Sequence, residues 1–87
     1  MGKYFNPRSV KFLLTEIKVG LTFAHTALTA KPGEKDKIER NSKNARKAYD
    51  ALLHFHPQVS LSEEESAKFE AGKNKLEAAL RVLGEFV

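Results

Sequence analysis

The 87-residue sequence contains no cysteine and no tryptophan, and it has only five glycines and three prolines. Without cysteine the chain forms neither disulfides nor thiolate metal sites, which excludes a disulfide-stabilised domain. The scarcity of glycine and proline leaves long stretches without the residues that most often interrupt regular secondary structure. We therefore expect a fold made of a few long elements.

Long hydrophobic runs are also missing. No segment reaches the roughly 18–20 consecutive apolar residues that a membrane-spanning helix requires. The most apolar stretch follows a basic N-terminal segment, but Glu16, Lys18 and His25 interrupt it, so it makes a poor core for a signal peptide. We therefore expect a cytoplasmic protein without a membrane segment.

The composition is that of a folded globular domain. Hydrophobic residues make up 41% of the chain and charged residues 30%, a balance unlike that of disordered proteins. A chain of 87 residues suffices for one core and not for two. Apolar residues recur with the three- to four-residue spacing of helices, and no stretch shows the alternation of a β-strand. The sequence therefore predicts a single all-α domain over residues 1–87.

Start and stop signals predict three helices, at about residues 7–29, 34–55 and 62–86. Asn6 is a good N-cap for the first helix, and Pro7 suits its first helical position. The second helix has acidic residues in its first turn, where the helix dipole favours them, and it ends before Pro57. The third helix begins at Ser62, which is predicted to form a capping box with Glu65.

The predicted helices are joined by short connections. Short loops make successive helices antiparallel neighbours, so we expect an up-down-up antiparallel three-helix bundle. Gly72 falls inside the third helix, where a glycine costs about 1 kcal/mol relative to alanine. It marks either a position without a packing role or a close crossing against the small residues Gly20 and Ala24 of the first helix.

The first helix carries two apolar rows. The first row has helical spacing and is predicted to face the core; it consists of Val10, Leu13, Leu14, Ile17, Leu21, Ala24 and Leu28. The second row consists of Phe12, Val19 and Phe23, and it lies roughly opposite the first at about 100° per residue.

A small bundle needs only one of these faces for its core. The second row is therefore predicted to be an interaction face, because soluble monomers limit the size of exposed apolar patches. It would pair two copies of the chain in a C2 homodimer, or it would dock another protein. The alternative is that the helix is twisted or kinked at Gly20, so that both rows meet the same core.

Basic residues give the chain a net charge of +4, and many of them lie in the second helix. Arg40, Lys43 and Lys47 share one face there, which makes that face an alternative nucleic-acid-binding surface. However, Asp36 and Glu39 stand four residues before Arg40 and Lys43 and neutralise part of the charge. No aromatic residue interleaves the strip to stack on bases. Nucleic acid is therefore less favoured than protein as a partner.

The three histidines are the candidate chemical groups. The segment Ala24-His25-Thr26 resembles the Ala-His-Thr of histidine phosphotransfer domains, which are four-helix bundles with a phosphorylatable histidine exposed on a helix. The resemblance covers three residues and implies phosphotransfer through His25. His54 and His56 point about 160° apart on a helix, an arrangement that does not suit a shared metal ion.

The sequence has little that points to an enzyme. It contains no cysteine nucleophile, no glycine-rich phosphate loop and no supported set of serine, histidine and acid. We therefore expect no catalytic residue, no metal and no cofactor. The preferred hypothesis is a small non-catalytic association module that self-associates or docks a partner helix through its first helix. Nucleic-acid binding and phosphotransfer are the alternative functions.

Overall fold

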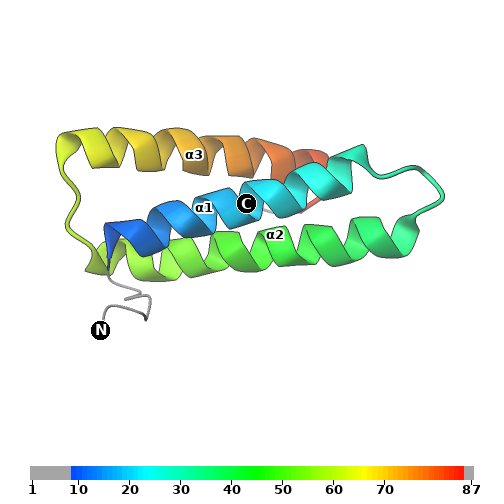
Figure 1. Cartoon of the computed structure of the whole chain (residues 1–87), viewed down its shortest axis with the longest axis horizontal. Coiled ribbons are helices and arrows are strands. Elements are labelled where there is room, and N and C mark those ends of the chain that lie inside the picture. Colours follow the sequence, from blue (N-terminus) through cyan, green and yellow to red (C-terminus); the bar gives the residue numbers. More distant parts are fainter. Residues whose placement is uncertain (1–8, 86–87) are drawn as a thin grey trace.

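The computed structural model describes residues 9–85, and it contains three long helices. They are α1 (Val10–Thr29), α2 (Lys35–Phe55) and α3 (Glu63–Val82), with a short 3-10 helix, η1 (His56–Gln58), directly after α2. Successive helices run in opposite directions, and α1 lies obliquely in front of the space between α2 and α3 (Figure 1). The prediction of an all-α, up-down-up three-helix bundle is confirmed.

The first helix begins at Val10, three residues later than predicted. Its N-cap is Ser9, whose backbone is extended and whose Oγ accepts a hydrogen bond from the Phe12 amide at 3.0 Å. That bond satisfies one of the amides that the first helical turn leaves without an intrahelical partner. The predicted cap at Asn6 and the predicted first helical residue, Pro7, lie outside the described residues.

The third helix begins as predicted and ends earlier. The Ser62 Oγ accepts a hydrogen bond from the Glu65 amide at 3.1 Å, and the Ser62 amide donates to Glu65 Oε1 at 2.9 Å, so the capping box is confirmed. The helix ends at Val82 instead of residue 86 because Gly84 has a φ of 89°, which favours glycine. The Glu85 amide then donates to the Leu80 carbonyl at 2.9 Å, closing a Schellman motif.

One apolar core joins all three helices. Its buried members are Leu13, Ile17, Ala24, Ala45, Tyr49, Leu52, Phe69, Leu76 and Leu80. On α1 the buried face also includes Gly20 and Ala27, whereas Leu28, which was predicted to face the core, is 44% exposed. The core face of α1 is therefore rotated from the predicted first row toward the second row.

Two glycines allow α1 to approach its neighbours closely. A Cβ at Gly72 of α3 would lie 2.6 Å from Cγ2 of Ile17, and a Cβ at Gly20 of α1 would lie 2.8 Å from Cδ2 of Leu76. The same Cβ at Gly20 would lie 3.2 Å from the Cβ of Ala48 on α2. Gly72 therefore does mark a close helix crossing, but its partner is Ile17 and not Gly20 or Ala24.

Candidate functional site

The predicted interaction row lies along the seam between α1 and α2. Phe12 and Phe23 are partly buried and pack against the core, whereas Val19 is 37% exposed. The Phe12 ring meets the Phe55 ring of α2 edge to face, with centroids 5.4 Å apart and an interplanar angle of 87°. This row therefore belongs to the edge of the intramolecular packing, with Val19 as its most exposed member.

The position of α1 between two other helices explains its wide apolar arc. On a helical wheel, Phe12, Val19 and Phe23 stand about 80–120° from the middle of the buried row. Leu14 lies on the opposite flank, and together with Glu65 of α3 it lines a shallow depression. One flank of α1 thus faces α2 and the other faces α3, so the second apolar row does not lie opposite the core.

A shallow depression of about 270 Å³ opens on the surface of α1 around the exposed Val19. We call it the Val19 depression; it is lined by Lys18, Val19, Thr22 and Phe23. The Thr22 hydroxyl donates to the Lys18 carbonyl at 2.9 Å, which leaves the methyl group of this threonine as its apolar part. The Val19 depression therefore has an apolar floor with one lysine beside it.

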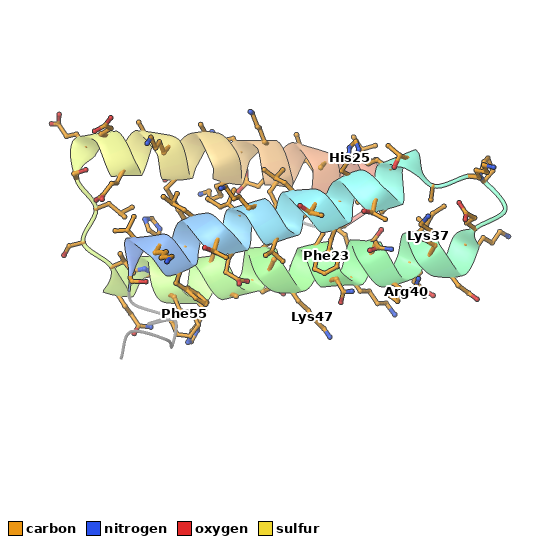
Figure 2. All side chains as sticks on the ribbon, viewed as in Figure 1. Phe23, His25, Lys37, Arg40, Lys47 and Phe55 are labelled. Atoms are coloured by element: carbon orange, nitrogen blue, oxygen red, sulfur yellow. The ribbon has the colours of Figure 1, made fainter. Side chains whose placement is uncertain are left out.

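The register between α1 and α2 places basic residues beside this depression. The Phe12–Phe55 contact and the Gly20–Ala48 approach align the two antiparallel helices. In that register Phe23 is level with residue 44, which is halfway between Arg40 and Lys47. Figure 2 shows Phe23 on the α2 side of α1, with the side chains of Arg40 and Lys47 extending from α2.

The cations near the depression differ in their partners. Within residues 9–85, none of the ion pairs involves Lys18, Arg40 or Lys47. Lys43, the third member of the predicted nucleic-acid face, pairs with Glu39 at 3.7 Å. Lys43 also lines a separate depression between α2 and the end of α3.

Glu16 is a residue of this seam that the sequence analysis did not single out. It follows Phe12 by one helical turn, is half-buried, and has no hydrogen bond or ion pair with another described residue. Burial raises the pKa of its carboxyl group above the ordinary value. The signal available in the sequence was its spacing, because it interrupts the row of Phe12, Val19 and Phe23 at a helical interval.

The opposite side of α2 is occupied by polar contacts with α3. The Tyr49 hydroxyl donates to Glu77 Oε2 at 2.7 Å, and Glu77 also pairs with Lys73 and Arg81, each at 3.9 Å. Burial and the Glu77 carboxylate raise the pKa of Tyr49 to about 12. Because these charged groups are already paired, this side offers less to a ligand than the α1–α2 side.

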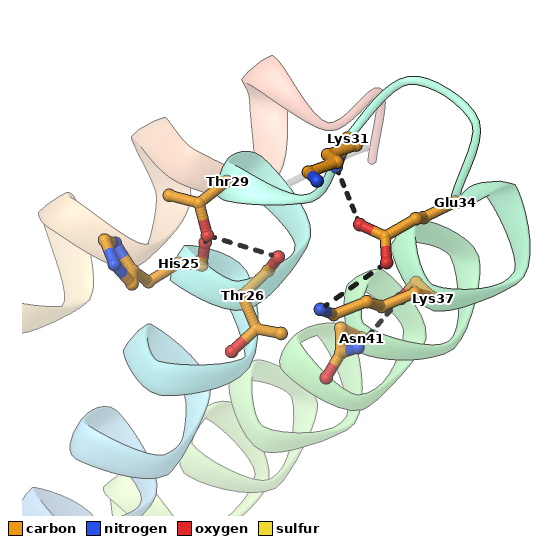
Figure 3. Close-up of polar contacts among 7 residues, drawn as sticks. All are labelled: His25, Thr26, Thr29, Lys31, Glu34, Lys37 and Asn41. Carbon is orange, nitrogen blue, oxygen red and sulfur yellow. Dashed lines mark hydrogen bonds and ion pairs between the residues drawn. The ribbon is translucent and has the colours of Figure 1, made fainter.

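The three histidines lie at separate places. His25 is exposed on α1, and its ring points away from the hydrogen-bonded groups around Lys31, Glu34 and Lys37 (Figure 3). The ring of His54 meets Phe55 edge to face, whereas the ring of His56 stacks on Phe69 with centroids 4.1 Å apart. Among residues 9–85, no group of three or more histidine, aspartate or glutamate residues is arranged to hold a metal ion.

The connection between α1 and α2 is held by local bonds. The Lys31 amide donates to Glu34 Oε1 at 2.9 Å, and the Lys37 ammonium lies 3.9 Å from the other oxygen of Glu34. Asn41 donates to the Lys37 carbonyl at 2.8 Å. These groups, drawn in Figure 3, therefore order the loop and the start of α2.

None of the helices in the described part of the chain is long and apolar enough to cross a membrane. Comparison with known protein families, with curated proteins and with solved structures found no match.

Proposed function

We propose that this protein is a non-catalytic association module that binds an α-helix of a protein partner along the α1–α2 seam. The observation that supports the proposal is the Val19 depression, an open and mainly apolar surface formed by residues of α1. Amphipathic helices bind such surfaces by placing apolar side chains at helical intervals into a groove. Phe12 and Phe23 would support the site from below, and Val19 would contact the partner directly.

Two other functions are the alternatives. Exposure of His25 on α1 is compatible with phosphotransfer, which requires a histidine accessible to a phosphodonor. Arg40 and Lys47 make no ion pair with described residues and are compatible with nucleic-acid binding, although Lys43 is paired with Glu39. A His25→Gln variant would abolish phosphotransfer and leave helix binding unchanged, whereas nucleic-acid binding would weaken steeply with salt.

The proposal is tested by selecting partner helices against the whole chain. A displayed library of amphipathic peptides of about 20 residues, long enough to follow the seam for about 30 Å, is selected on the wild-type protein. The selected peptides are then measured against the Val19→Glu variant. The matched control is Leu53→Glu, because Leu53 is 41% exposed and lies on the other side of α2.

We expect peptides that bind the wild type and the Leu53→Glu variant with equal affinity and bind the Val19→Glu variant at least tenfold more weakly. A charge placed in the apolar floor would have to be desolvated by the docked helix, which accounts for the loss. Circular dichroism would verify that both variants retain the helical fold. A selection that returns no peptide with this dependence on Val19 would contradict the proposal.

A further inference from the structure

We infer that the partner helix is acidic, with carboxylates on both sides of the apolar stripe that enters the Val19 depression. The inference rests on the proposed function and deepens it by naming the chemistry of the partner. It follows from the charges on α1 and α2, from the lack of ion pairs between these cations and other described residues, and from the charges that a second copy of the chain would present.

Cations stand on both sides of the depression. Lys18 lines it on α1, and Arg40 and Lys47 lie on α2 one turn to either side of the position level with Phe23. A helix that placed an apolar side chain over Val19 would run between these two sets of cations. Its residues flanking the apolar stripe would therefore come within reach of Lys18 on one side and of Arg40 and Lys47 on the other.

These three cations differ from other basic residues of α2. Lys37 pairs with Glu34, and Lys43 pairs with Glu39, so their charges are already compensated. Lys18, Arg40 and Lys47 make no ion pair within the described part of the chain. A docked partner would remove water from them, and this loss is offset only if the partner supplies opposite charge.

A second copy of the chain supplies little of that charge, because Asp36 of α2 is outnumbered on this surface by three cations. In a C2 dimer the same surface meets itself, so a surface that carries Lys18, Arg40 and Lys47 would face a second surface with the same three cations. The one acidic residue of α1, Glu16, lies in the seam, and burial already raises the pKa of its carboxyl group. Charge complementarity therefore favours a different, acidic chain over the homodimer.

The apolar floor distinguishes a helix from other polyanions. A nucleic acid is held mainly through its phosphates and gains nothing from Val19, whereas an amphipathic helix uses apolar and charged contacts together. The same reasoning separates a protein helix from an anionic lipid surface, which would also meet the exposed cations elsewhere on the molecule. Both polyanions are nevertheless included in the test.

The test determines which residue types the selected peptides carry at the positions that flank the apolar stripe. These positions are encoded equally as aspartate, glutamate, lysine, arginine, glutamine and serine before selection. We expect aspartate and glutamate to be enriched on both flanks. We also expect the Arg40→Gln/Lys47→Gln variant to bind the selected peptides about fivefold to tenfold more weakly, and the wild-type affinity to fall as sodium chloride is raised.

The matched control is Lys68→Gln/Lys75→Gln, which removes two exposed cations of α3 that also make no ion pair with described residues. This variant should bind the peptides as the wild type does. Equal loss in both double variants would show that only the net charge of the protein matters, and it would overturn the assignment of Arg40 and Lys47.

The remaining outcomes separate this inference from the proposed function. Peptides that depend on Val19 but show no preference for acidic flanks would overturn the inference and leave the proposed function standing. No peptide dependent on Val19 would overturn both. Tighter binding to a double-stranded DNA oligonucleotide or to phosphatidylserine vesicles, lost in the Arg40→Gln/Lys47→Gln variant, would overturn the acidic helix. A homodimer in sedimentation equilibrium that Val19→Glu dissociates would do the same.

Discussion

The two sides of α2 use different means to hold their neighbours. Toward α1, Ala48 and Gly20 approach closely and the Phe55 ring packs on Phe12. Toward α3, α2 makes fewer contacts, and long polar side chains bridge the gap, with Tyr49 bonded to Glu77. Small residues therefore bring two helices together where backbones are near, and hydrogen-bonded side chains connect them where backbones are farther apart.

The two sides of α2 also differ in how many of their charged side chains form ion pairs with described residues. On the α3 side, Arg46 pairs with Glu85 at 3.7 Å, and Glu77 has three partners. On the α1 side, Arg40 and Lys47 make no ion pair with described residues, and Val19 is exposed. Charged side chains of α2 and α3 thus pair across one side of the helix, whereas Arg40 and Lys47 on the other side make no ion pair with described residues.

The largest expected effect comes from enlarging the Ala48 side chain, which lies at the close contact with α1. Ala48→Leu should lower the free energy of unfolding by about 1–3 kcal/mol, because the longer side chain has no space beside Gly20 and Leu76. Urea denaturation followed by circular dichroism measures the change. Ala51→Leu is the control, since Ala51 is half-buried one turn further along α2, and its effect should stay below about 0.5 kcal/mol. Equal effects at both positions would show that the Ala48 contact is not tight.

The second test removes the polar contact with α3. Tyr49→Phe should cost about 1–2 kcal/mol of unfolding free energy, because the variant loses a 2.7 Å hydrogen bond to a carboxylate while keeping the ring in the core. The Glu77 carboxylate retains Lys73 and Arg81 as partners, which limits the loss. A stability equal to that of the wild type would mean that ion pairs alone hold this side.

The Tyr49 hydroxyl should ionise at a higher pH than an ordinary tyrosine. In a Tyr4→Phe background, absorbance at 295 nm should report ionisation of Tyr49 near pH 12, because burial and Glu77 raise its pKa from the ordinary value of 10.0 to about 12. Because the folded pKa is raised, the stability that this tyrosine contributes is complete below about pH 10 and is lost as pH rises through about 12. Ionisation at pH 10 in the folded protein would contradict the buried contact.

The smallest expected effect concerns the carboxyl group in the α1–α2 seam. Glu16→Gln should raise the free energy of unfolding at pH 7 by about 0.5 kcal/mol, because an ionised carboxylate without a cation is removed from a half-buried site. Since the folded pKa of Glu16 is raised, its neutral form favours folding at low pH and this benefit is lost as pH rises. The gain should therefore shrink as pH falls toward the ordinary glutamate value of 4.5.

A control of opposite sign is available in α3. Glu64 stands in the first turn of that helix, where the helix dipole favours a negative charge, so Glu64→Gln should lower stability slightly. Thermal unfolding of both variants across pH 4–8 makes the comparison. A Glu16→Gln variant that behaves as Glu64→Gln does would show that Glu16 is solvated like an ordinary surface carboxylate.

The sequence predicted the three helices and their arrangement because periodicity and end signals act locally. The capping box at Ser62 is an example, since both of its bonds lie within four residues. The start of α1 was predicted too early for a local reason as well: Asn6 and Ser9 both belong to residue types that cap helices, and Pro7 after Asn6 pointed to the earlier of the two. The structure places the cap at Ser9.

The orientation of α1 could not be predicted as well. Gly20 and Ala27 contribute little to a hydrophobic pattern, yet they occupy its buried face, where the neighbouring helices are nearest. Large side chains such as Leu28 suggested a different centre for that face. Periodicity gives the angle of each residue around its own helix, but it does not give the number of helices packed around it. The candidate site at Val19 depends on how many helices pack around α1, so periodicity alone could not predict it.

The interlock between α1 and α3 has a mechanical consequence. Ile17 fits against Gly72, and Leu76 fits against Gly20, so each helix carries both a projection and a notch. Sliding α1 along α3 by one residue would drive a branched side chain into backbone, and rotating α1 would press Gly20 against Ala48. The surface that α1 presents is consequently preorganised, and a ligand seated on it would not have to spend binding free energy on ordering the helix beneath.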